Sequence, residues 1–238
     1  MHQIQVSNFT IDVVRKPIKN MHLSVYPPTG RVRIAAPLNI DDAAVKLFVV
    51  SKLGWIKRNQ RKFAKQERQS PRALVERESH YFEGKRYLLR ITEHTAPPKV
   101  FIKTKTYIDL LVRPNTTAEQ RQTILNEWYR EQLKNRIPAL IKKWEKIIGV
   151  KVADWGVKQM KTKWGTCNIE AKRIWINLEL AKKPATCLEY IVVHEMIHLL
   201  ERYHNDNFFS LIEKYMPKWK QHKDELNRLP VSFEEWVY

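Results

Sequence analysis

The sequence predicts an α+β fold, with a β-rich N-terminal part followed by a compact part that mixes strands and helices. Three observations predict this. Branched and aromatic residues alternate with polar ones over the first 40 residues, and helical spacing follows in two long stretches. After residue 150, strand, hairpin and helix patterns succeed one another. With eight Trp, nine Tyr, eight Phe and 43% hydrophobic residues, the chain can build a proper core.

The first strands are expected in "IQVSNFTIDVVRK" and "MHLSVYPPTGRVRIAAP", where "PPTG" is typical of a hairpin turn. Asp41 is a plausible N-cap for one long helix over residues 42–69. The later part of that helix, "KRNQRKFAKQER", carries six basic residues against one acidic residue. Such a face is either solvated or suited to a polyanion.

The middle of the chain predicts a loop, three strands and a second long helix. The loop is "QSPRALVERESHY", and the strands lie in "YFEGKRYLLRITEH", "KVFIKT" and "YIDLLVRP". The helix should cover residues 117–148, with Thr117 and Gln120 as a capping box and Gly149 at its end. Pro138 should kink this helix or split it in two.

The C-terminal part predicts strands in "VKVADWGVKQM", "KTKWGTCN" and "IWINLEL", then two helices. The first helix has Pro184 near its first turn, and the second, over residues 206–229, should bend at Pro217. We therefore expect two regions. Residues 1–115 form a β-rich region with one long basic helix, and residues 116–238 form a metal-dependent hydrolase domain.

The net charge of +18 is the outlying property of the composition. A basic balance of this size favours polyanionic partners such as nucleic acid, nucleotides or acidic protein surfaces, or only adds to solubility. Two cysteines make no disulfide framework, the N-terminus lacks a signal-peptide pattern, and no apolar run is long enough to span a membrane. The simplest expectation is a cytoplasmic protein without membrane contact.

The segment His194-Glu195-Met196-Ile197-His198 has the H-E-x-x-H pattern. Positions four apart lie on one face of a helix, so both imidazoles can reach a single ion. Imidazole ligands favour Zn²⁺. Glu195 then stands where it can act as a general base on a metal-bound water, which predicts a hydrolase.

A catalytic zinc site needs a third protein ligand. In an unbroken helix His204 would lie about 120° around the axis from His198 and about 9 Å along it, too far to share the ion. We therefore expect the helix to end near Arg202 or Tyr203, followed by the turn formers "NDN". Glu213 on the next helix is the rival third ligand.

The segments "WGTC", "INLELAKKP", "LEYIVVHEMIHLLERYHNDNFF" and "MPKWKQHKDELN" resemble the YgjP-like branch of the SprT-like zinc metallopeptidases. The resemblance is dense over residues 150–228 and weaker before them. It implies a compact zincin-like metallopeptidase domain in which His194, His198 and His204 bind zinc and Glu195 is the general base. The family pattern usually has Ser where this chain has Thr166, and Glu201 stands where metzincins need glycine.

The segment before the metal helix predicts the substrate side of the site. In zincin-like folds an edge strand beside this helix pairs with an extended substrate. Trp164 could wall the cleft, and Thr166 or Asn177 could hydrogen-bond near the substrate. Cys167 is expected to be a small buried residue rather than a fourth ligand.

Three functions remain open at this level. The leading one is a zinc-dependent metallopeptidase acting on a peptide or protein. The second keeps the metal but hydrolyses a nucleotide phosphoanhydride, with nearby lysines stabilising phosphate charge. The third is a basic nucleic-acid-associated module with structural zinc.

Overall fold

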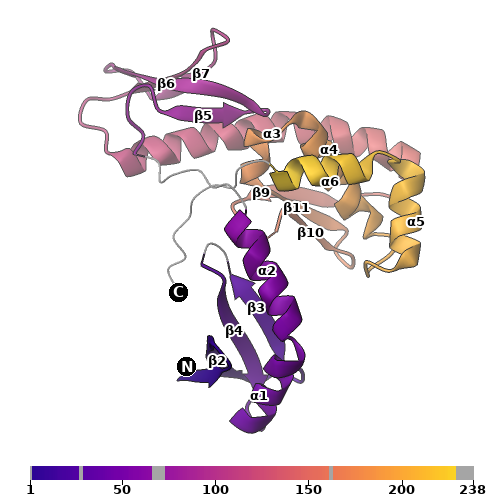
Figure 1. Ribbon diagram of the computed structural model, residues 1–238. Coiled ribbons are helices and arrows are strands. Elements are labelled where there is room, and N and C mark those ends of the chain that lie inside the picture. The colour runs from indigo at the N-terminus through magenta and orange to yellow at the C-terminus, as the bar shows by residue number, and fades with distance from the viewer. Residues whose placement is uncertain (1, 27–28, 66–72, 161–162, 229–238) are drawn as a thin grey trace. The chain divides into compact units, whose positions relative to one another are not determined.

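The computed structural model describes residues 2–26, 29–65, 73–160 and 163–228, and its sheets and helices confirm the α+β class (Figure 1). The chain forms two compact units, residues 1–67 and 68–238. The sequence placed the boundary near residue 115 instead. The strands between these two positions belong to the second unit because Leu89, Ile108 and Leu110 share one hydrophobic core with the helix that follows them.

The first unit is a four-stranded sheet covered by two helices (Figure 1). The strands stand in the order β1-β2-β4-β3, with β2 and β4 parallel and both outer pairs antiparallel. The apolar side chains that face the helices form a core of their own. The elements are β1 (His2–Val6), β2 (Phe9–Lys16), β3 (His22–Tyr26), β4 (Arg31–Pro37), α1 (Asp42–Ser51) and α2 (Leu53–Lys65).

The single helix predicted over residues 42–69 is instead two helices, with Lys52 between them. Asp41 is the N-cap of α1, as predicted, and its side chain accepts a hydrogen bond from the Ala44 amide. Lys52 leaves helical geometry at φ −108° and ψ 5°, two residues before Gly54, a residue that stabilises helices poorly. Residues 66–69 of the prediction, and Pro27 and Pro28 of the predicted hairpin turn, lie outside the described residues.

The second unit begins with a sheet of the same design, in the order β5-β6-β8-β7 with β6 and β8 parallel. Its turn residues Glu83 and Gly84 both have positive φ. Their amides donate to the carbonyls of Ala181 and Lys182, which ties the hairpin to the segment before the metal helix. The strands are β5 (Ser79–Phe82), β6 (Lys85–Glu93), β7 (Lys99–Phe101) and β8 (Tyr107–Val112).

Helix α3 (Ala118–Ile148) is continuous over 31 residues. The predicted capping box of Thr117 and Gln120 is confirmed, as is the stop at Gly149, which has φ 80°. Pro138 lies inside the helix and does not split it. The buried stripe from Leu125 to Ile148 holds the helix together across the missing amide donor.

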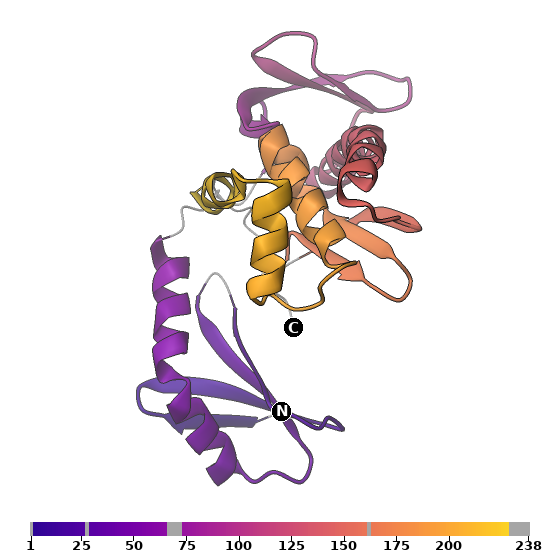
Figure 2. The same cartoon turned by 90° about the vertical axis from the view of Figure 1, so that its right-hand side faces the viewer.

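The remaining elements surround the predicted site. Strands β9 (Asp154–Lys158), β10 (Gly165–Asn168) and β11 (Arg173–Asn177) form a sheet in the order β10-β11-β9, so β10 is an edge strand. The 3₁₀ helix η1 (Leu178–Lys182) leads into α4 (Ala185–Ile197). In Figure 2, α4 runs between α3 and the pair α5 (Asp206–Tyr215) and α6 (Trp219–Arg228).

The last predicted helix is therefore two helices, which end and begin on either side of Pro217. Proline has no amide hydrogen and its ring disfavours helical geometry in the preceding residue, so the chain turns there instead of bending. Among the described helices, none combines the length and the apolar character that crossing a membrane requires.

Candidate metal centre

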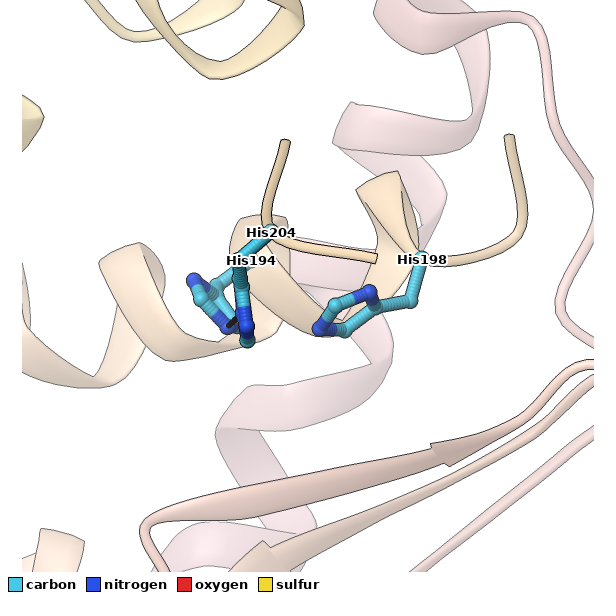
Figure 3. Close-up of side chains that lie close together, drawn as sticks. All are labelled: His194, His198 and His204. Carbon is cyan, nitrogen blue, oxygen red and sulfur yellow. Dashed lines mark hydrogen bonds between the residues drawn. The ribbon is translucent and has the colours of Figure 1, made fainter. Parts of the chain in front are cut away.

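Three imidazoles converge at the end of α4, and Figure 3 shows their rings turned toward one another. One ring nitrogen from each of His194, His198 and His204 lies within 4.8 Å of the other two. The ring centroids are 4.8 to 5.0 Å apart. Among the described residues, this is the one group of three or more potential metal ligands.

Helix α4 positions the first two imidazoles because they stand one turn apart on the same face. The helix ends at Ile197, and His198 is its C-cap with helical φ and ψ of −60° and −18°. The amides of Leu200 and Glu201 still donate to the Ile197 carbonyl, at 2.9 and 3.0 Å. The predicted end of the helix before His204 is therefore confirmed, but it lies about one turn earlier than Arg202.

Glu201 shapes the loop that brings His204 back to the helix. Its carboxylate accepts hydrogen bonds from the Tyr203 amide and from Asn207 Nδ2, both at 3.0 Å. These bonds lower the pKa of Glu201. Its carbonyl lies 3.0 Å from His198 Nδ1, and a bond donated by this nitrogen leaves Nε2 free as a ligand. The residue that breaks the metzincin pattern thus orders this loop.

Two of the three imidazoles, His194 and His204, lie where their uncharged form is favoured, and this form can bind a cation. Burial, followed by the neighbouring histidines, lowers the pKa of His194 to about 3. Burial also lowers the pKa of His204, with His198 the next cause. His194 Nε2 and His204 Nε2 are 3.0 Å apart, and His194 Nδ1 is buried with no hydrogen-bond partner among the described residues. Two lone-pair nitrogens this close fit a shared metal ion.

Phe208 forms the floor of the cluster. This residue of α5 is 1% exposed, and its ring centroid lies 4.6 to 5.0 Å from those of all three imidazoles. The Asn205 side chain accepts from the Phe208 amide and so begins α5 at this place. Phe208 therefore limits the rotation of each imidazole and excludes water from below.

Glu195 lies beside the cluster in an almost fully buried position, 5% exposed. Burial raises its pKa to about 8, while the charge of Lys163 acts in the opposite direction. The carboxyl group rests on Gly165 of β10, where an added Cβ would be 2.6 Å from Glu195 Oε1. Only glycine leaves room for the carboxyl at this point.

An open cleft of about 1000 Å³ joins these groups. It is lined by the three histidines and Glu195, and by Trp164 and Thr166 from the edge strand and its approach. Asn177 does not line it. Its buried side chain instead donates to the carbonyls of Met160 and Lys163, both at 2.7 Å, and accepts from the Glu179 amide at 3.1 Å.

The rival ligand Glu213 points away from the cluster. Its Oε2 accepts from Trp219 Nε1 at 2.6 Å and lies 3.5 Å from Lys220 Nζ. Cys167 lines the cleft but is not in the ligand group. Burial, and then Glu195, raises the pKa of its thiol to about 11, so it stays protonated and is a poor ligand.

Sequence reasoning missed three residues of the site. Gly165 supports Glu195, Tyr190 lies one turn before His194 with its ring 5.9 Å away, and Lys223 reaches the cleft from α6. Helical spacing on α4 could have pointed to Tyr190. No local pattern could have placed Gly165 or Lys223, because both depend on how separate elements pack.

Comparison with known proteins gives a family. A family model described as "YgjP-like, metallopeptidase domain" matches residues 19–229. Among curated proteins, no match is found.

Two solved structures show a weak likeness. The metallopeptidase zymogen of Pyrococcus abyssi abylysin is 21% identical, with 40% of this chain and 99% of that chain covered and a TM-score of 0.36. The metallopeptidase zymogen of Methanocaldococcus jannaschii jannalysin is 18% identical, with 38% and 92% covered and a TM-score of 0.34. Both structures resemble less than half of this chain, whereas the family model spans most of it. The chain therefore belongs to the YgjP-like family and carries its metallopeptidase domain.

Proposed function

We propose that this chain is a zinc-dependent metallopeptidase whose ion is held by His194, His198 and His204. The observation that carries the proposal is the convergence of three imidazoles beside a buried carboxyl in one open cleft. Nitrogen ligands of this kind favour Zn²⁺, and three protein ligands leave a position for substrate or water.

The ion, when bound, would act as a Lewis acid that polarises the scissile carbonyl. Glu195 serves as the general base, taking a proton from the attacking water and returning it to the leaving amine. Its buried position holds the carboxyl in one place between α4 and Gly165. Burial raises the pKa of this carboxyl and so strengthens it as a base, and a bound cation beside it would favour the ionised form that takes up the proton.

The edge strand β10 gives the substrate a place to bind. Its free edge can pair with an extended peptide, and this pairing would lay the scissile bond along the cleft. Trp164 and Thr166 would contact that peptide, because both line the cleft. Asn177 would not contact the peptide. It would position β10, because its side chain donates to the carbonyls of Met160 and Lys163 before this strand.

Glu195→Gln tests the proposal. The amide keeps the size of the side chain but cannot take up the proton, so peptide hydrolysis should fall about 10²- to 10⁴-fold. Metal content, measured by elemental analysis, should stay at one ion per chain because the imidazoles are unchanged. Glu127→Gln, an exposed change on α3, is the control. Unchanged hydrolysis by the Glu195 variant would rule out this role.

A second substrate class has its own support in the cleft. Lys163, Arg202 and Lys223 line it, whereas Glu170 is its one acidic lining residue besides Glu195 in the part of the chain that the structure describes. Such a lining suits an anionic substrate, including a nucleotide phosphoanhydride. Casein and nucleoside triphosphates, each assayed with and without chelator, separate the two activities. Equal behaviour of wild type and the Glu195 variant in both assays would favour structural zinc.

A further inference from the structure

The two four-stranded sheets are copies of one design. In each sheet the first and third strands along the chain lie at the two edges, and the second and fourth pair in parallel at the centre. Each sheet is followed by a helix that is capped at its N-terminus. The caps Asp41 and Thr117 are separated by the same number of residues as the buried strand residues Ile34 and Leu110. The same spacing joins Val49 of α1 to Leu125 of α3, which are both buried.

Because the design occurs twice, the residues of α1 and α2 can be compared with those at the corresponding positions of α3. Three positions of α3 that are not buried carry polar residues: Thr123, Asn126 and Glu131. The residues that precede these three by the distance from Asp41 to Thr117 are Leu47, Val50 and Trp55, on the helices of the first unit. Their exposures are 73%, 51% and 39%. The shared design therefore does not require apolar side chains at these places.

The surroundings of these three residues, here called the α1–α2 face, are strongly basic. The two helices, together with Lys52 between them, contain seven Lys and Arg residues and a single acidic residue, Asp42. Asp42 is already bound, since it pairs with Arg15 and with His2 at 2.8 Å. Within the part of the chain that the structure describes, these helices offer no second carboxylate to balance the positive charge, which an external partner can do.

We propose that the α1–α2 face is a docking surface for an acidic, amphipathic segment of a partner protein. The apolar side chains of that segment would cover Leu47, Val50 and Trp55, and its carboxylates would meet the surrounding basic residues. A nucleic acid offers phosphates to the basic residues, but its base edges and sugars cover the aliphatic side chains of Leu47 and Val50 less completely than an apolar helix face does. A bilayer requires a broad apolar helix face, and the inner side chains Val45 and Val49 are already buried in the core.

The test uses the full chain and a labelled synthetic peptide whose leucines follow helical spacing and whose other positions are glutamate. Leu47→Thr, Val50→Asn and Trp55→Gln are combined, which gives the face the polarity of α3 without changing its charge. Binding should weaken about tenfold or more. Ile147→Thr, at a residue of the second unit that is 47% exposed, should leave binding unchanged.

Other outcomes separate the possible partners. Affinity for the peptide should fall as salt rises, and a peptide with lysine in place of glutamate should not bind. The proposal is wrong if the triple variant binds like wild type, or if the lysine peptide binds equally well. It is also wrong if only an oligonucleotide or phosphatidylserine vesicles bind through Leu47. Unchanged melting temperatures across the variants establish that folding is preserved.

Discussion

At the scale of single residues, the site divides into groups that sequence could find and groups that it could not. His194, Glu195 and His198 follow from helix periodicity alone, and His204 from the need for a break after them. Gly165 is different. Its value lies in the missing Cβ, since the Glu195 carboxyl occupies the space that a Cβ would need.

Gly165→Ala should therefore displace Glu195. The methyl group would lie 2.6 to 2.9 Å from the carboxyl atoms, so either β10 or the Glu195 side chain must move. We expect hydrolysis to fall about 100-fold, as a small misplacement of a catalytic group can cause. Gly54→Ala is the matched control, because a Cβ there meets nothing within 4 Å. Full activity in the Gly165 variant would show that the carboxyl has freedom to shift.

The choice between His204 and Glu213 is a second residue-scale prediction. His204→Ala removes one of three ligands and should weaken zinc affinity by about 100-fold or more, measured by competition with a chromogenic chelator. Glu213→Gln should leave zinc affinity unchanged, since its carboxylate faces Trp219 and Lys220. The opposite ranking would restore Glu213 as the third ligand.

At the scale of elements, most helices and strands were predictable but several ends were not. The caps at Asp41, Thr117 and Gly149 were read correctly because capping depends on a few neighbouring residues. The break at Lys52 and the continuity of α3 through Pro138 were not. The continuity of α3 depends on tertiary packing, which local propensity does not contain. The break at Lys52 has a local signal in Gly54, but the helical spacing of the apolar residues favoured one helix.

Pro138→Ala should stabilise the protein. The new amide can donate to the Lys134 carbonyl, a bond that proline cannot make in this helix. Pro138 is exposed, so no packing is lost, and we expect about 1 to 3 kcal/mol of added stability in denaturant unfolding. Pro114→Ala, an exposed change in the loop before α3, should bring no gain. A gain of equal size at Pro114 would mean that the helix is not the cause.

At the scale of the whole molecule, the described residues form two separate hydrophobic cores. Sequence reasoning divided the chain at residue 115 because it grouped all early strands together. Strands β5–β8 pack with α3, and local periodicity does not predict which distant segments pack together. The functional site is unaffected by this difference, as all its residues lie in the second unit.

Asp12 offers a pH-dependent test of this division. It is 2% exposed, binds Arg31, and accepts from Gln3 Nε2 at 2.8 Å, and the Arg31 bond is the main cause that lowers its pKa. A lowered folded pKa adds stability above the unfolded value of about 3.9. This stability is lost as the pH falls through the folded pKa. Asp12→Asn should therefore cost about 1 to 3 kcal/mol at pH 7 and progressively less below about pH 4.

Hydrogen exchange locates the effect of this substitution. Amides of β1–β4 should exchange faster in the Asp12 variant at pH 7, and those of α3 and α4 should keep wild-type rates. Equal acceleration in α4 would show that the two cores unfold as one.

The separation of the two cores also shapes how this chain can diverge. No described residue belongs to both, so a change in one leaves the packing of the other intact. Lineages can therefore change the exposed side chains of α1 and α2, and with them the partner, while the imidazole cluster stays fixed. We expect relatives of this chain to share the reaction more widely than they share the surface of the first unit.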